Sequence, residues 1–104
     1  MQLRVSSPGH DLGPNDVEGI EQDLEKIDRR LSKYDNVDCE VRISGHQGNP
    51  TVHAVVELDF GRTHLIAKAD GSDARQAVRE AREDLLRQIN DRSRKGHSWF
   101  TKRR

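Results

Sequence analysis

Cysteine and aromatic residues are scarce in this chain. Its 104 residues include one cysteine, Cys39, and only four residues that are Phe, Trp or Tyr. A single cysteine cannot form an intrachain disulfide, which fits a reducing compartment. Hydrophobic residues make up 32% of the chain, which allows one modest core rather than the large pocket of many enzymes.

Long apolar runs are also missing. No stretch approaches the roughly 20 apolar residues of a membrane span. The N-terminal residues MQLRVSSPGH lack the apolar run of a signal peptide. We therefore expect a cytoplasmic protein without a membrane partner.

Motifs for catalysis are absent too. The five histidines do not combine into HExxH, HxH or a Cys-His cluster with metal-ligand spacing. No GxSxG, P-loop or GxGxxG motif occurs. We expect His53 and His64 on one face of a hairpin. In one register of this hairpin Glu57 neighbours His64, and we expect a cross-strand pair on the surface rather than a metal or acid–base site. Cys39 alternates with polar residues in a strand, so we expect an inert buried thiol. The sequence predicts no enzyme, no metal, no cofactor and no small-molecule substrate.

The charge is balanced overall but unevenly distributed. The chain has 18 Lys and Arg and 18 Asp and Glu. From Arg75 onward there are ten bases against four acids, which leaves eight bases and fourteen acids in residues 1–74. A net of +6 in one segment and −6 in the other indicates a basic interaction surface.

Alternation of apolar and polar residues predicts four strands. They cover residues 1–7, 37–44, 51–60 and 62–69, and the last two form an antiparallel hairpin around Phe60 and Gly61.

Apolar residues at spacings of three and four predict two helices. The first covers 16–33, with its apolar stripe at Val17, Ile20, Leu24, Ile27 and Leu31. The second covers 74–94, with its stripe at Ala74, Ala77, Val78, Ala81, Leu85 and Ile89. Ser72 or Asp73 is the expected N-cap, and Gly96 the expected end.

The order β-α-β-β-β-α predicts a two-layer α+β domain. Four strands with one apolar face each and two helices with one apolar stripe each are buried together when both helices pack on one face of the sheet. We expect residues 1–95 to form this single domain and residues 96–104 to form a basic, flexible tail.

Several segments resemble one protein family. The chain is similar to the hibernation-promoting factor and ribosome-associated inhibitor family, formerly called sigma-54 modulation proteins. The similarity lies in MQLRVSS, in LEKIDRRLSKY and above all in ADGSDARQAVREAREDLLRQI. In the last segment Gly71, Asp73, Ala77, Val78, Leu85, Arg87, Gln88 and Ile89 match the family's acidic-glycine cap, its Ala-Ile step and its Leu-x-Arg-Gln-Leu run.

The resemblance implies a double-stranded-RNA-binding-like fold and a function. Members of the family bind the small ribosomal subunit between head and body, over the mRNA and tRNA sites, through basic residues on the two helices. Carried over, the resemblance implies contacts with ribosomal RNA from Lys26, Arg30, Lys33, Arg87, Arg94 and Lys95. The basic character of the same segments adds Arg29, Arg75, Arg79, Arg82, Arg92, Lys102, Arg103 and Arg104. Longer members have a C-terminal dimerisation domain, for which this chain has no room.

The sequence departs from the family at three positions of the second helix. Asp84 and Asp91 stand where relatives often have lysine, and Arg75 replaces a frequent tyrosine. Arg79, Arg82 and Arg92 restore positive charge on the same helix, and the sequence leaves the exact RNA footprint open.

The ending HSWFTKRR has two interpretations. Trp99 on a basic segment suits an RNA cleft, because bases stack on aromatic rings. The alternatives are that Trp99 packs onto the domain or that the tail is disordered.

Two functions compete with ribosome binding. One is a protein-binding regulator, such as a transcription-factor modulator, with which the acidic residues of the first helix are compatible. A generic double-stranded-RNA-binding module is the other alternative.

Overall fold

The computed structural model describes residues 1–8, 12–45 and 50–102, with side chains described as far as Arg92. The elements follow the predicted order: β1 (Gln2–Ser6), α1 (Pro14–Arg30), β2 (Val37–Gly45), β3 (Val52–Phe60), β4 (Thr63–Gly71) and α2 (Ala74–Lys102). The predicted fold class, a two-layer α+β domain of β-α-β-β-β-α order, is confirmed.

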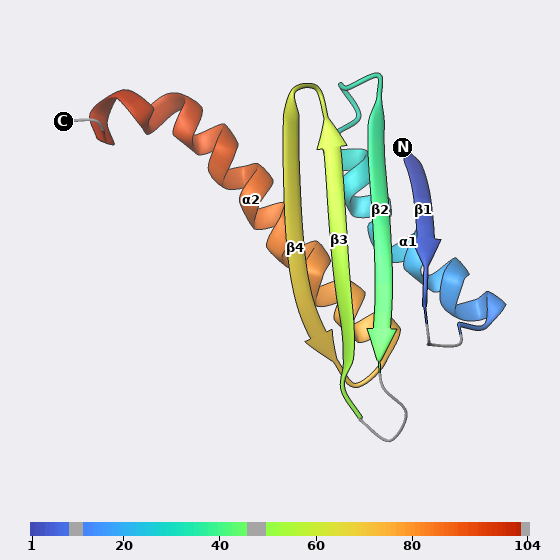
Figure 1. The fold of residues 1–104 in the computed structure, drawn as a ribbon. Coiled ribbons are helices and arrows are strands. Elements are labelled where there is room, and N and C mark those ends of the chain that lie inside the picture. The colour runs from blue at the N-terminus through green and yellow to red at the C-terminus, as the bar shows by residue number, and fades with distance from the viewer. Residues whose placement is uncertain (9–11, 46–49, 103–104) are drawn as a thin grey trace.

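The four strands form one sheet in the order β1-β2-β3-β4. β1 is parallel to β2, so the chain must cross the sheet through α1, while β2, β3 and β4 form an antiparallel meander (Figure 1). The predicted hairpin is confirmed, with Phe60 opposite Thr63. Gly61 takes a φ of 57° at the first central position of this turn, a conformation that glycine adopts without strain.

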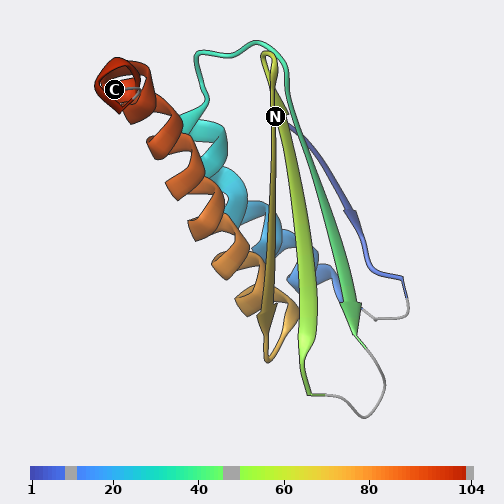
Figure 2. The same ribbon diagram turned by 60° about the vertical axis from the view of Figure 1, so that its left-hand side comes forward.

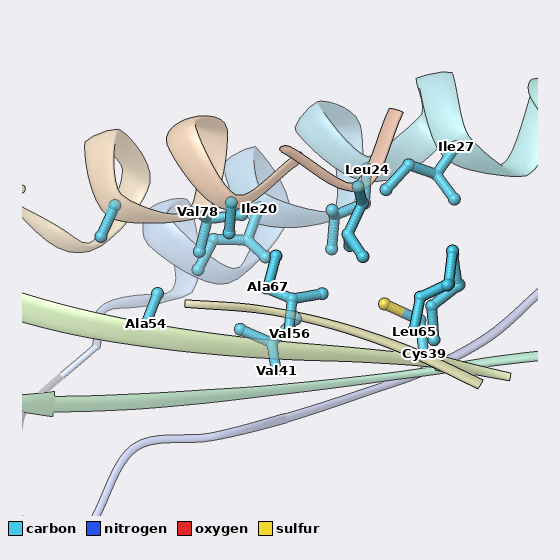
Figure 3. Close-up of a cluster of buried hydrophobic side chains, with 14 of the residues drawn as sticks. Ile20, Leu24, Ile27, Cys39, Val41, Ala54, Val56, Leu65, Ala67 and Val78 are labelled. Atoms are coloured by element: carbon cyan, nitrogen blue, oxygen red, sulfur yellow. The ribbon is translucent and has the colours of Figure 1, made fainter. Parts of the chain in front are cut away.

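Both helices cover the same face of the sheet, and the other face is open (Figure 2). Figure 3 shows how residues of α1, α2 and the inward strand positions meet in one core. Ile20, Leu24, Ile27, Val41, Val56, Val78 and Leu85 are completely buried. In β2 and β3 every second residue is buried, because successive side chains of a strand point to opposite faces.

Contacts at the start of α2 fix its position against β4. The carboxylate of Asp73 accepts a hydrogen bond from the main-chain N–H of Gln76 at 2.8 Å, so Asp73 is the N-cap. A Cβ at Gly71 would lie 2.6 Å from the main-chain nitrogen of Ala77, so only glycine lets β4 approach the helix this closely. Further along, the side-chain amide of Gln88 donates to the carbonyl of Ile66 on β4 at 3.0 Å.

The helix boundaries differ from those expected. α1 begins at Pro14 and ends at Arg30, so Lys33 lies in the turn after the helix. A proline at the first position of a helix needs no hydrogen-bond partner for its nitrogen, which explains the earlier start. Val17 is half-buried rather than buried, because it lies in the first turn of α1, beyond the main core.

The expectation that Gly96 ends the second helix is wrong. α2 continues through Gly96 to Lys102, and its C-terminal turns project past the sheet (Figure 1). A glycine inside a helix costs about 1 kcal/mol relative to alanine, which weakens the helix without ending it. Residues 96–102 therefore have helical backbone in the structure, and the flexibility of this basic segment stays a prediction. None of the described helices combines the length and apolar character of a membrane span.

Candidate nucleic-acid interface

The two helices lie side by side and run in the same direction. Arg75 at the start of α2 approaches Gly19 of α1, and Arg30 at the end of α1 is bonded to Asn90 of α2. Along their contact, residues at spacings of three and four from each helix form a line on the surface. We call this line the interhelical seam; it comprises Gly19, Asp23, Lys26 and Arg30 of α1 and Arg75, Arg79, Arg82 and Asn90 of α2.

Asp23 is the centre of the seam. Its carboxylate accepts hydrogen bonds from Arg75 at 3.3 and 3.4 Å and from Arg79 at 3.2 Å. Arg82 donates to the main-chain carbonyl of Asp23 at 3.2 Å. The Asp23 side chain is only 10% exposed, so three guanidinium groups converge on one shielded carboxylate.

Gly19 makes room for this arrangement. A Cβ at this position would lie 2.4 Å from Nε of Arg75 and 2.5 Å from its Cζ. Arg75 therefore lies across the surface of α1 at the point where α1 has no side chain. Arg75 thus joins the two helices.

Arg82 is largely shielded from solvent. Its side chain is 14% exposed, and it forms an ion pair with Glu83 at 2.8 Å in addition to its bond to Asp23. Arg75 and Arg79 are 36% and 49% exposed, so part of each guanidinium faces water. Of the three arginines, Arg79 is the most available to a ligand.

The seam has more positive than negative charge. It contains five cations, Lys26, Arg30, Arg75, Arg79 and Arg82, and one carboxylate, that of Asp23. Arg30 is held by a neutral partner, because Asn90 Oδ1 accepts from its Nε at 3.3 Å and from its Nη2 at 3.1 Å. Bonding to a neutral amide fixes the direction of the guanidinium and leaves its charge intact.

The other predicted residues lie at the end of α1, in the turn after it and in the middle of α2. Arg29 is exposed in the last turn of α1, and Arg92 is exposed on α2. Lys33 has its Nζ 5.6 Å from the centre of the Tyr34 ring. Arg87 is 73% exposed and lies 3.8 Å from Asp84, so its charge is partly offset.

Some predicted residues lie outside the described side chains. Arg94, Lys95, Trp99 and Lys102 belong to the backbone of α2, but their side chains are not described. Arg103 and Arg104 lie outside the described residues altogether. Their contacts with RNA stay a prediction.

The open face of the sheet has paired histidines. His53 is 2.5 Å from Asp70, and His64 is 2.6 Å from Asp59 and 3.5 Å from Glu57. The expected proximity of Glu57 and His64 is therefore confirmed. The hydrogen bond to Asp59 raises the pKa of His64, with a further contribution from the charge of Glu57.

The described side chains form no metal-binding cluster. Across residues 1–8, 12–45 and 50–92, no group of three or more His, Cys, Asp or Glu could hold a metal ion. Cys39 is 1% exposed, and burial raises the pKa of its thiol to about 12. This thiol is the inert core residue that the strand pattern predicts.

Fold and seam together define the class of the protein: a two-layer α+β domain that presents a row of cations on its helical layer. The family model described as sigma 54 modulation protein / S30EA ribosomal protein matches residues 3–97. Because this match covers most of the chain, the chain belongs to that family. The family resemblance of the sequence is thereby confirmed, and the family description names no enzymatic activity.

Two solved structures have the same fold. The N-terminal domain of Protein Y from Thermus thermophilus superposes with a TM-score of 0.74 at 16% identity, covering 86% of this chain and 96% of that domain. A ribosomal subunit interface protein from Coxiella burnetii gives 0.76 at 15% identity, covering 89% of this chain and 98% of that one. At such low identity these likenesses show a shared fold. No curated protein matches the sequence significantly.

Proposed function

We propose that this chain is a ribosome-associated translation inhibitor of the hibernation type. In this proposal it acts in the cytoplasm, binds the small subunit between head and body and occludes the mRNA and tRNA sites. Family membership over residues 3–97 supports an association with the ribosome. One protein of the same fold is described as a ribosomal subunit interface protein.

The interhelical seam is the observation that carries the proposal. Ribosomal RNA presents closely spaced phosphates, and arginine binds phosphate oxygens through two parallel N–H groups. Asp23 and Asn90 hold Arg75, Arg79 and Arg30 in place before any ligand binds. Ordered side chains lose less conformational entropy on binding, so a fixed row of guanidinium groups favours a rigid ligand such as folded RNA.

Inhibition by occlusion needs no chemical step. Structured RNA is recognised largely through its shape and backbone, and a small rigid domain is sufficient for this. The described extents of 51 × 29 × 17 Å give an elongated body with which to fill a cleft. The function therefore requires position and charge but neither a cofactor nor a metal.

Co-sedimentation with ribosomes in a sucrose gradient tests the proposal. We expect the protein with small subunits or whole ribosomes at low salt, and in the top fractions as salt rises, because phosphate contacts release counterions. In the double variant Lys26→Gln and Arg79→Gln, the slope of log affinity against log salt decreases by roughly one for each cation removed.

The matched control lies on the open sheet face. Arg42 and Lys68 are exposed there, so Arg42→Gln with Lys68→Gln changes the net charge by the same amount at a distance from the seam. This control should leave ribosome binding unchanged. Equal losses of ribosome binding in both double variants would mean that net charge alone matters. Recovery of the unmodified protein only in the top fractions at low salt would refute ribosome association.

A protein-binding regulator is the second candidate. Glu18, Glu21 and Glu25 are exposed on α1, and an acidic helix face suits a basic protein partner. Changing all three to glutamine should not weaken ribosome binding. If this variant loses function while the seam variant retains it, the regulator is the better explanation.

A further inference from the structure

A cavity of about 200 Å³ lies where the seam meets the β3–β4 turn. The end of α1, the turn that follows it, the β3–β4 turn and the middle of α2 contribute to it. Its lining comprises Arg30, Leu31, Lys33, Tyr34, Phe60, Thr63, Ile89 and Arg92. Because Arg30 belongs to both the seam and the cavity, the row of cations continues into this opening.

The lining of the cavity has three cations and no carboxylate. Among the described side chains, no carboxylate forms an ion pair with Arg30, Lys33 or Arg92. The C-terminal end of α1 contributes a partial negative charge of about half an elementary charge from the helix dipole. Three full positive charges outweigh it, so the cavity favours an anion.

Two aromatic rings form part of the cavity wall. Tyr34 and Phe60 meet edge to face, with their ring centres 5.0 Å apart and their planes at 64°. Phe60 is 5% exposed and supports Tyr34 from the core side, while Tyr34 is half-buried. A supported, partly exposed ring beside cations is suited to a flat ligand that also has a negative charge.

A second hollow on the other side of these rings is acidic. Tyr34 and Phe60 also line it, together with Asp35, Asp38 and Asp59. Three carboxylates repel phosphate, so the rings separate a cationic opening from an anionic one. A phosphate chain is therefore restricted to the side of the seam.

We propose that this cavity binds a single unpaired nucleotide of the RNA, with its base against Tyr34 and its phosphate among Arg30, Lys33 and Arg92. A volume of about 200 Å³ is below the roughly 300–1,000 Å³ of sites for drug-sized ligands, which makes a whole dinucleotide cofactor too large. The Thr63 hydroxyl in the lining can donate to or accept from a base edge. The proposal rests on the proposed function, because the seam brings the RNA to the cavity.

Nuclear magnetic resonance titration of the ¹⁵N-labelled chain tests this site. The probes are adenosine 5′-monophosphate, inorganic phosphate and two RNA hairpins that differ only by one bulged nucleotide. We expect adenosine monophosphate to move the amide signals of Lys33, Tyr34 and Thr63, and inorganic phosphate to leave those of Tyr34 and Thr63 in place. The bulged hairpin should bind about tenfold more tightly than the regular one, a preference within the range for stacking one base.

The double variant Lys33→Gln and Arg92→Gln should abolish the preference for the bulge, and both positions are exposed, so the fold should persist. Arg92→Gln alone, with the same expected direction, is the second variant if the double one is unstable. Arg42→Gln with Lys68→Gln is the matched control and should keep the preference.

Each result bears on the site independently of the ribosome. Equal affinities for the two hairpins would overturn the proposal, and so would a phosphate titration that reproduces the shifts of adenosine monophosphate. Binding of adenosine monophosphate without a preference for the bulge would mean a site for free nucleotides and would also overturn it. Failure to co-sediment with ribosomes would contradict the proposed function, while the hairpin titrations would still decide the cavity.

Discussion

The substitution Asp23→Asn removes the charge at the centre of the seam while keeping the size of the side chain. It weakens the bonds from Arg75 and Arg79, which are 3.2 to 3.4 Å long and whose donors are 36% and 49% exposed. Because exposed ion pairs are worth about 0–1 kcal/mol each, we expect the free energy of unfolding to decrease by about 1–2 kcal/mol. The hydrogen bond from Arg82 to the main-chain carbonyl persists, while the longer ion pair of Arg82 with the carboxylate, at 4.0 Å, is lost.

Urea denaturation followed by circular dichroism measures this change. The midpoint should shift at an unchanged m-value, because the surface exposed on unfolding stays the same. Glu25→Gln on the same helix is the control, and as an exposed substitution it should change stability by less than about 0.5 kcal/mol. A loss above about 4 kcal/mol would refute the calculation and indicate a fully desolvated ion network. No measurable loss would show that the arginines do not hold the helices together.

The same variant separates two roles of Asp23 in binding. Removing a negative charge from the seam should maintain or increase affinity for ribosomes, because the partly exposed Arg75 and Arg79 then face the phosphates without the Asp23 carboxylate between them. Loss of binding in a folded Asp23→Asn variant would contradict this and would mean that the fixed directions of Arg75 and Arg79 are what the RNA requires.

Two further predictions concern the core and the open face. Leu85→Ala should lower the free energy of unfolding by about 2–5 kcal/mol in the same urea assay, because Leu85 is completely buried. Val17→Ala should lower it by less, because Val17 is only half-buried, and equal decreases would contradict the observed core. Since the bond to Asp59 raises the pKa of His64, its contribution to stability is complete below the unfolded pKa of about 6.5 and is lost as the pH rises through the folded pKa. Thermal midpoints from about pH 6 to 8 should show this decrease, and His64→Gln should remove it; a ¹H titration of His64 with a pKa below 6.5 would refute it.

The fold could be predicted because apolar residues recur at a regular spacing in each helix and strand. Leu24 and Leu85 lie in helical stripes, and Val41 and Val56 in strand alternations, so the two layers follow from burying all of them together. The helix ends could not be predicted so well. Their positions depend on small differences in free energy, such as the tolerance of one glycine at position 96.

The site could be predicted only in part. The row Arg75, Arg79 and Arg82 is visible in the sequence as an i, i+4, i+7 pattern, but its common partner Asp23 lies on the other helix. The spacing of Gly19, Asp23, Lys26 and Arg30 by three and four residues indicates that they share one face of α1. That this face lies against Arg75, Arg79 and Arg82 follows only once the helices are known to be parallel. Residues from three separate parts of the chain line the cavity beside Tyr34, so no local sequence pattern predicts it.

The position of β1 has a consequence for how the domain opens. β1 is a five-residue edge strand with half-buried Leu3 and Val5, and its pairing with β2 closes a loop that contains all of α1. Closing a long loop costs entropy, so the meander of β2, β3 and β4 can form before β1 pairs, and β1 can detach while the meander stays intact. Detachment would uncover the edge of β2 to pairing with another chain, and the outward Glu40 and Arg42 place charges there that oppose flat aggregation.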